Sequence, residues 1–257
     1  MSEQPVLLEV RDRIATITLN RPGARNALSR ELLQMLPQVM QQAEDDADVD
    51  VIVLTGADPA FTAGLDLKEL GEGVLLDTER AAGVHKIFPE LTKPLIGAIN
   101  GVAVTGGFEL VLNCDFVIAS ENARFADTHA RVGVQPGWGL TVLLPQAIGV
   151  RRARELSLTG RFLDAATAYD WGLVNHVVPH ADLMPTTYAI AAAIVDNDQD
   201  GVRRILRTYA ENFAEQEAWE NEAAAGAAWE DEQFSAEKVA ARREGIQARG
   251  RQLTSGA

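Results

Sequence analysis

Continuous apolar strands that end in glycine turns are the feature that most constrains the fold of this chain. Residues 51–55 and 95–99 are five-residue apolar runs, followed by Gly56 and by Asn100-Gly101, and residues 115–119 give a third such run. Apolar runs without polar alternation are typical of strands that are buried on both faces. Helical patterns separate these runs, so the chain is predicted to be an α/β protein.

Other segments have simpler signals. Residues 7–10 and 14–19 are rich in β-formers and predict a hairpin. Ser29 is expected to cap a helix with a 3.6-residue apolar period, in which Pro37 predicts a kink or an early break. We expect a flexible loop over residues 71–77, a weaker helix over 79–91, helices over 150–159, 164–171, 183–195 and 202–213, and a tail rich in Ala, Glu and Arg over 215–249.

The composition excludes several classes of protein. A net charge of −14 argues against a general nucleic-acid binder, which needs a basic face. Cys114 is the single cysteine and stands in no zinc-type grouping with the four histidines, so neither a disulfide framework nor a metal site is expected. Residues 1–10 lack a signal-peptide pattern, and the most apolar segment, 95–114, is broken by four glycines and contains Glu109. A cytoplasmic protein without a membrane span is therefore predicted.

The glycine segments also suggest a chemistry. A thioester that gains or loses a proton at its α-carbon develops negative charge on its carbonyl oxygen, which fixed N–H donors stabilise. Such N–H groups must be free, as they are in glycine turns and at helix N-termini. Gly106-Gly107 opens a predicted helix directly after a strand and offers such donors. A tight turn that needs a positive φ is the alternative explanation of each glycine pair.

Several motifs together resemble the enoyl-CoA hydratase (crotonase) family in order and spacing. They are Asn20-Arg21-Pro22 through Asn26-Ala27-Leu28, the Phe-x-Ala-Gly-x-Asp-Leu segment from Phe61, the Gly-Gly-x-Glu-Leu segment from Gly106 with Cys114-Asp115 after it, Pro136-Gly-x-Gly, and Leu158-Thr159-Gly160-Arg161 through Gly172-Leu173-Val174-Asn175 to Val178-Pro179. The resemblance covers about residues 7–179 and is highly specific, because several linked motifs occur in sequence order.

The resemblance implies a fold and a site. The fold is a spiral of ββα units, with an α/β core over residues 1–195 and a C-terminal helical region over 196–257 that helps to assemble trimers or hexamers. The N–H groups of Leu65 and Gly106 would form an oxyanion hole, and Glu109 would be catalytic. The positions that hold the CoA part of an acyl-CoA substrate correspond to Arg25, Ala27, Ala63, Gly64, Asp66, Leu67 and Gly107. No metal, redox cofactor or nucleic acid is implied.

The chain departs from the family at three positions. Hydratases carry a second glutamate where this chain has His129, Thr105 replaces a glycine beside the oxyanion donor, and Trp138 stands where a small residue is common. Histidine suits proton transfer because its ordinary pKa is about 6.5. We therefore expect Glu109 and His129 to hold the attacking water, with a packed His129 bonded to Asp127 or backbone as the alternative. Trp138 is expected to wall the acyl pocket, with simple loop packing as the alternative.

Three functions remain open at this stage. The first is the hydration of a trans-2-enoyl-CoA to a 3-hydroxyacyl-CoA, a carbon–oxygen lyase reaction of fatty acid metabolism. The second is another reaction of the family on an acyl-CoA, such as isomerisation, dehydration or hydrolysis. The third is an acyl-CoA-binding protein without catalysis, which the replacement of the second glutamate by His129 suggests.

Overall fold

The two β-runs at the start of the chain form the predicted hairpin. In the computed structural model, which describes residues 4–73 and 87–255, β1 (Val6–Arg11) pairs antiparallel with β2 (Ile14–Leu19). Asp12 and Arg13 connect them with φ values of 50° and 62°. Two left-handed residues in succession give a turn whose twist matches that of the strands, so the pairing begins at the turn.

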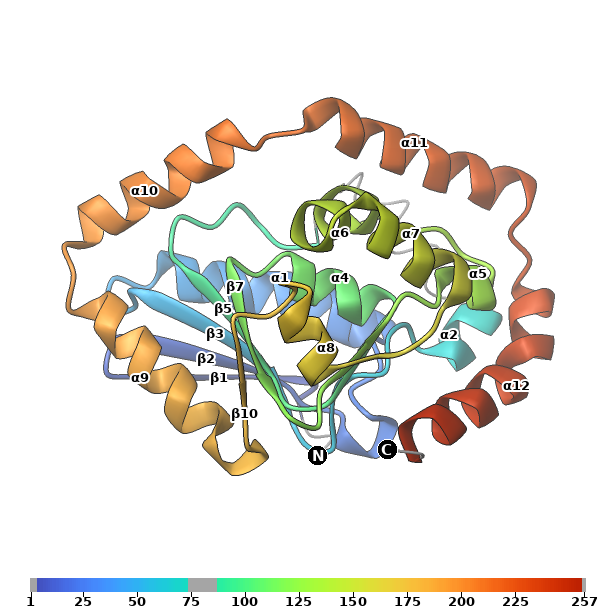
Figure 1. Cartoon of the computed structure of the whole chain (residues 1–257), viewed down its shortest axis with the longest axis horizontal. Helices are drawn as coiled ribbons and strands as arrows, with labels where there is room; N and C mark the ends of the chain where they lie inside the picture. Colours follow the sequence, from blue (N-terminus) through green and yellow to red (C-terminus); the bar gives the residue numbers. More distant parts are fainter. Residues whose placement is uncertain (1–3, 74–86, 256–257) are drawn as a thin grey trace.

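A six-stranded sheet grows from this hairpin in the order β1-β2-β3-β5-β7-β10 (Figure 1). The strands after β2 pair in parallel: β3 (Val51–Gly56), β5 (Leu95–Ile99), β7 (Phe116–Ser120) and β10 (His176–Val178). β3, β5 and β7 confirm the strands predicted from the three apolar runs. β10 has three residues, too few for a pattern to reveal it.

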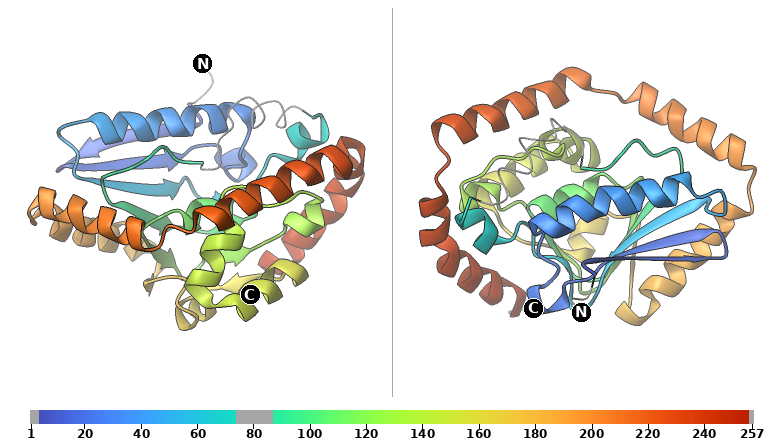
Figure 2. Two further views of the ribbon diagram at one scale, coloured as in Figure 1. Left: turned by 90° about the horizontal axis from the view of Figure 1, so that it is seen from above. Right: turned by 180° about the vertical axis from the view of Figure 1, so that it is seen from behind.

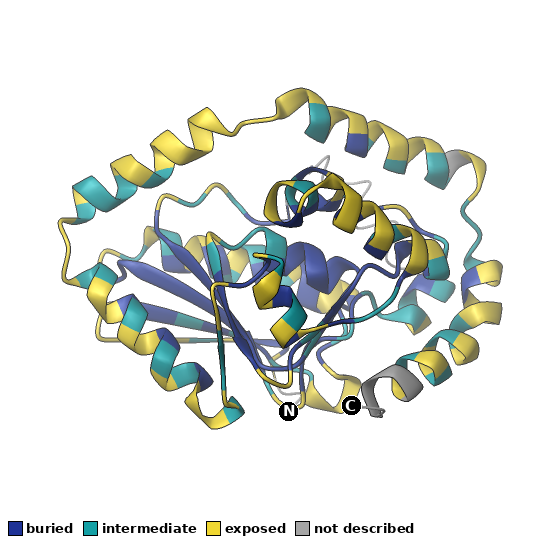
Figure 3. Ribbon diagram, in the orientation of Figure 1, coloured by how far each residue is buried: buried dark blue, intermediate teal, exposed yellow. Residues whose placement is uncertain are grey.

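Helices cover both faces of this sheet, as the apolar strands predict. Ile52 and Leu54 pack in the same cluster as the buried side of α1 (Arg30–Asp45), whereas Val51 and Val53 pack with α9 (Leu183–Val195). Successive residues of a strand point to opposite faces, so α1 and α9 lie on opposite sides. In Figure 3 the strands between them are coloured as buried along most of their length.

Helix α1 begins as predicted and does not break at Pro37. Ser29 Oγ accepts a hydrogen bond from the N–H of Leu32 at 3.3 Å, and the helix continues through Pro37 to its end. The predicted early break is therefore wrong. Leu36 and Met40, before and after the proline, are fully buried against the sheet. This burial outweighs the hydrogen bond that proline cannot make.

A second, four-stranded sheet lies beside the first and was not predicted. Its order is β4-β6-β8-β9, with β4 (Ala60–Thr62), β6 (Val102–Val104), β8 (Arg124–Ala126) and β9 (Leu163–Asp164). Each of the first three follows a strand of the large sheet and precedes a short helix: α2 (Leu67–Gly71), α4 (Gly106–Leu112) and α5 (His129–Val132). Three successive ββα units result, which is the predicted spiral.

Two glycines allow the chain to cross between the sheets. A Cβ at Gly56 would lie 2.5 Å from the carbonyl oxygens of Ala60 and Phe61, and one at Gly101 would lie 2.6 Å from that of Pro59. Any side chain there would push the crossings apart. These two glycines are therefore required by close backbone approach.

The remaining helices form an outer layer and a long arm. The helices α6 (Leu140–Ile148), α7 (Val150–Thr159) and α8 (Ala165–Asp170) follow the three units. Next come α9 and the arm, formed by α10 (Gln199–Asn212), α11 (Gln216–Glu232) and α12 (Ala236–Ser255), which runs around the edge of the molecule (Figures 1 and 2). α11 packs on α6, and α12 packs on α2 and α5. The division between core and C-terminal region at residue 195 stays a prediction.

Some expectations concern residues that the structure leaves undescribed. The predicted loop over 71–77 begins with the end of α2, and its residues 74–77 lie outside the described part of the chain, as do residues 79–86 of the predicted helix over 79–91. Residues 87–91 are described and are not helical. Among the described helices, none combines the length and the apolar character that a membrane crossing needs.

An ion pair between Arg13 and Asp50 ties the hairpin turn to the start of β3. Nε and Nη2 of Arg13 donate to the two carboxylate oxygens of Asp50, the second at 2.8 Å, and Asp50 is buried. The hydrogen bond from Arg13 holds the pKa of Asp50 below its ordinary value. We expect Asp50→Asn to lower the free energy of unfolding by about 1 kcal/mol at pH 7.

The loss should depend on pH. Because the folded pKa of Asp50 lies below the unfolded value of about 3.9, its contribution is present above that pH and is lost as the pH falls through the folded pKa. Urea denaturation of both proteins at pH 7 and in more acidic buffers is the test. An equal loss at every pH would show that the ion pair contributes nothing.

Candidate active site

Two backbone N–H groups lie side by side at the ends of paired strands. β4 and β6 are parallel neighbours, so the residues that follow them, including Leu65 and Gly106, emerge at the same edge. Gly64, with φ +80°, lies so close to β6 that a Cβ on it would be 2.7 Å from the carbonyl oxygen of Val104. Within the described chain, the N–H groups of Leu65 and Gly106 have no hydrogen-bond acceptor. They are free to bind an oxyanion.

Glu109 lies one turn into α4, the helix that begins at Gly106. Its side chain is only 2% exposed. One carboxylate oxygen accepts hydrogen bonds from the N–H groups of Gly137 and Trp138, at 3.2 and 2.8 Å. The second oxygen faces His129. Two N–H donors and an adjacent histidine thus satisfy the two oxygens of this buried carboxylate.

His129 lies between two carboxylates. It is the first residue of α5, and its Nε2 lies 3.3 Å from Oε2 of Glu109, while its Nδ1 lies 2.7 Å from Oδ1 of Asp127. The same Asp127 oxygen accepts the backbone N–H of His129 at 3.1 Å. The structure therefore brings the two predicted catalytic side chains together, and it also contains the His129–Asp127 bond of the alternative interpretation.

His129, Glu109 and Asp127 form an acid–base trio in which the charge of each residue acts on its neighbour. Burial lowers the pKa of His129, but the charge of Glu109 and the hydrogen bonds to both carboxylates outweigh it and raise the pKa to about 10. Burial raises the pKa of Asp127, and the hydrogen bond and charge of His129 bring it below its ordinary value. The two carboxylates thus favour the imidazolium form of His129, in which each ring nitrogen can donate its proton toward a carboxylate.

The residues around the oxyanion donors are closely packed. A Cβ on Gly106 would lie 2.6 Å from Cζ3 of Trp138, and a Cβ on Gly107 would overlap Cγ2 of Thr62. Both positions therefore exclude a side chain. Gly107, predicted to contact CoA, instead packs against β4, while Trp138 is buried over Gly106. Whether Trp138 also walls the acyl chain stays a prediction.

Thr105 has a conformation that glycine would adopt without strain. Its φ is 55° and its ψ −123°, unusual values for a β-branched residue. Its hydroxyl lies 2.5 Å from that of Thr128, and both residues are buried. The hydrogen bond to Thr128 holds Thr105 in place beside the oxyanion donor, at the position where the sequence departs from the family.

A pocket of about 630 Å³ opens next to these residues. Five residues predicted to bind CoA line it, together with the predicted oxyanion residue Leu65: Arg25, Ala27, Ala63, Asp66 and Leu67. Thr105 and Thr128 also line it, whereas Gly64, Glu109 and His129 do not. The pocket thus reaches the threonine pair next to the buried trio, and CoA binding by the residues on its other side stays a prediction.

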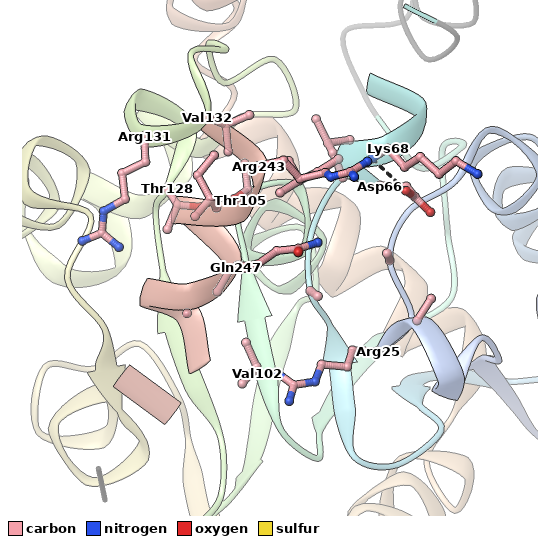
Figure 4. Close-up of a pocket in the computed structure, with 18 of the residues that line it drawn as sticks. Arg25, Asp66, Lys68, Val102, Thr105, Thr128, Arg131, Val132, Arg243 and Gln247 are labelled. Carbon is pink, nitrogen blue, oxygen red and sulfur yellow. Dashed lines mark hydrogen bonds between the residues drawn. The ribbon is translucent and has the colours of Figure 1, made fainter. Parts of the chain in front are cut away.

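The C-terminal helix completes this pocket. Arg243 and Gln247 of α12 line it opposite Arg25, as Figure 4 shows. Helix periodicity gives no information about where this helix docks, so the sequence alone does not indicate that Arg243 lines the pocket. Asp66 also has a structural role: it caps α2 and accepts a hydrogen bond from Arg21 at 3.2 Å.

The described residues contain no group of three or more His, Cys, Asp or Glu side chains that could hold a metal ion. The acid–base trio has three such residue types, but His129 separates its two carboxylates and both ring nitrogens are already engaged.

Comparison with known proteins gives the same picture. The model of the enoyl-CoA hydratase/isomerase family matches residues 9–251. A probable peroxisomal enoyl-CoA hydratase 1 of Arabidopsis thaliana is 43% identical over 195 residues, 75% of this chain and 73% of its own. A short-chain-enoyl-CoA hydratase of Clostridium acetobutylicum is 39% identical over 198 residues, 75% of this chain and 76% of its own.

Solved structures agree with the fold. The crystal structure of an enoyl-CoA hydratase from Mycobacterium avium superposes with a TM-score of 0.81 at 50% identity, covering 88% of this chain and 97% of that one. The family match over most of the chain, the relatives and the shared fold lead to one conclusion: this chain belongs to the enoyl-CoA hydratase/isomerase family.

Proposed function

We propose that this protein is an enoyl-CoA hydratase that uses a glutamate–histidine pair. The observation that carries the proposal is the buried ion pair between Glu109 and His129, 3.3 Å apart. Glu109 lies on α4, the helix that begins at the donor Gly106, and His129 begins α5. Hydration needs one group that accepts a proton from water and one that donates a proton to carbon. A carboxylate and an imidazolium supply these two functions.

The charge states assign the roles. Glu109, as the base, takes a proton from water, whose oxygen attacks C3 of the trans-2-enoyl thioester. The electron pair of the double bond moves toward the carbonyl, and the N–H groups of Leu65 and Gly106 stabilise the resulting enolate oxygen. C2 then takes a proton from Nε2 of His129. The product is a 3-hydroxyacyl-CoA, with a protonated Glu109 and a neutral His129.

The short distance between the two groups closes the cycle. The proton on Glu109 passes to Nε2 of His129 across the 3.3 Å that separates them. Asp127 keeps Nδ1 protonated throughout, because it accepts that hydrogen bond at 2.7 Å. It fixes the orientation of the ring and favours the cationic form. No metal or redox cofactor has a role in this sequence of steps.

The loss of crotonyl-CoA absorbance in wild type and variants tests the proposal. We expect Glu109→Gln to reduce kcat by about 10³-fold and His129→Gln by about 10²-fold, since each removes one proton-transfer group. His176→Gln is the matched control, because His176 is exposed on β10. Dialysis against EDTA should leave the wild-type rate unchanged.

The outcomes separate the alternatives. Tight acyl-CoA binding with an unaltered ligand would indicate the non-catalytic binder. Conversion of a 3-enoyl-CoA, without hydration of the 2-enoyl-CoA, would indicate an isomerase. Equal rates for wild type, Glu109→Gln and His129→Gln would refute the pair mechanism while leaving the reaction itself intact.

The rate should also depend on pH in an unusual way. Because the pKa of His129 is raised to about 10, its acidic form is present at neutral pH and is lost only as the pH rises through that value. The alkaline limb of kcat/KM is therefore expected near pH 10 and not near 6.5. Asp127→Asn removes one of the two carboxylates that raise the pKa and should move the limb to lower pH. A wild-type limb near 6.5 would mean that the trio does not act as described.

We also propose that the protein assembles as a homotrimer or homohexamer. The supporting observation is an exposed apolar row along α10 and its C-cap residue, formed by Ile205, Tyr209 and Phe213, which are 59–65% exposed. Residues four apart in a helix share one face, so the row is continuous. Light scattering should give three or six times the chain mass of 27.8 kDa. Phe213→Asp should shift the mass toward the monomer, and a monomeric wild type would contradict the proposal.

A further inference from the structure

Helix α11 holds the loop that anchors Glu109. This loop, residues 133–139, connects α5 to α6 and donates the two N–H groups that bind Glu109. Four residues of α11 lie against it: Trp219, Glu222, Gly226 and Trp229. Their spacing of three, four and three places them on one face of the helix. The whole inner face of α11 is thus directed at the 133–139 loop.

Glu222 makes the strongest of these contacts. It is 6% exposed, although it belongs to an arm whose outer side is solvated (Figure 3). One carboxylate oxygen accepts the N–H of Gly139 at 2.6 Å, and the other accepts the N–H of Thr141 at 2.6 Å and also its hydroxyl. Three donors bind a single buried carboxylate.

The N-terminus of α6 depends on this carboxylate. Its N-cap residue is Gly139, which has no side chain that could accept the free N–H groups of the first turn. Glu222 accepts them from another helix, and its negative charge interacts favourably with the positive end of the α6 dipole. Gly139 has φ +96°, and a Cβ on it would overlap the ring of Trp219, so the turn and α11 fit closely.

Two carboxylates therefore bind neighbouring N–H groups of one short segment. Glu109 takes those of Gly137 and Trp138, and Glu222 takes those of Gly139 and Thr141. Burial raises the pKa of Glu222, and the negative charge of Glu109 adds to this effect. The two carboxylates are thus close enough to interact while they share the same backbone segment.

We infer that Glu222 is a positioning residue for Glu109. By fixing Gly139 and the first turn of α6, Glu222 holds the N–H groups of Gly137 and Trp138 in the direction that orients the Glu109 carboxylate. The inference rests on the proposed hydratase function for its kinetic readout. It does not require contact between Glu222 and substrate, and it makes α11 part of the machinery that aligns the base.

The variant that tests this role is Glu222→Gln. Glutamine has the same size but only one acceptor oxygen, so at least one of the three donors would face an NH₂ group. Glu220→Gln is the matched control: Glu220 is exposed on the same helix and pairs only with Gln216, at 2.9 Å, among the described contacts. Trp229→Phe is a second variant, which keeps the ring packing and removes the hydrogen bond from Nε1 to the carbonyl of Gly133, 3.0 Å long.

Kinetics with crotonyl-CoA give the first readout. We expect Glu222→Gln to lower kcat by about 10-fold to 100-fold, because a misplaced base loses rate steeply, while KM stays within about twofold of wild type. The pocket predicted to bind CoA is lined by other elements, so binding should persist. Trp229→Phe should change kcat in the same direction, and Glu220→Gln should match wild type in both constants.

Amide hydrogen exchange gives a readout that needs no substrate. In Glu222→Gln the N–H groups of Gly137 and Trp138 should exchange faster, by about tenfold or more, although neither of them binds Glu222. The inference would be overturned if Glu222→Gln kept the kcat of the wild type. It would also be overturned if the two amides exchanged in Glu222→Gln at the same rate as in Glu220→Gln. If the wild type fails to hydrate crotonyl-CoA, the proposed function falls, and the exchange of Gly137 and Trp138 still decides the role of Glu222.

Discussion

The parallel pairing of two three-residue strands is the constraint on which the site depends. β4 and β6 contribute little area, but their pairing places the turn after one beside the helix that begins after the other. Gly64 and Gly107 fill the contact between these two segments, where a Cβ would meet Val104 or Thr62. The two free N–H groups owe their positions to this contact. Preorganised donors stabilise charge without reorganising when it develops, and the fold preorganises these two N–H groups for the oxyanion role proposed above.

The buried acid–base trio follows a second constraint, which is charge balance. An isolated carboxylate or imidazolium at this depth would be strongly destabilising. Glu109 and Asp127 together compensate His129, and two backbone N–H groups satisfy the outer oxygen of Glu109. The histidine that replaces a family glutamate is therefore accommodated by the aspartate two residues before it, with which it forms both a side-chain and a backbone hydrogen bond.

The sequence predicted the elements whose signal is local. β3, β5 and β7 are long enough to show a buried apolar run, and Ser29 marks the start of α1. The oxyanion residues and the pairing of Glu109 with His129 came from the resemblance to a family, because no local pattern relates positions on two different helices. The strands β4, β6 and β8 escaped prediction since three residues carry no periodicity and their pairing arises only after the chain crosses between sheets.

Contacts from the C-terminal helices were the hardest to foresee. Glu222 stands in a stretch rich in Ala and Glu that is typical of a solvated helix, and its partner Gly139 is 83 positions away. Arg243 has a similar composition around it and lines the pocket. In both cases the deciding information is the direction in which the arm wraps, which depends on long-range packing of α11 on α6 and of α12 on α2 and α5.

The arm also sets the order in which the site becomes complete. During synthesis, the ribosome makes Leu65, Gly106, Glu109 and His129 by about the middle of the chain. The residues that cap α6 and close the pocket emerge last. Domains made by the ribosome fold from the N-terminal side, and contacts of high sequence separation form late. The contacts that fix Gly139 and that line the pocket from α12 are thus formed at the final docking step.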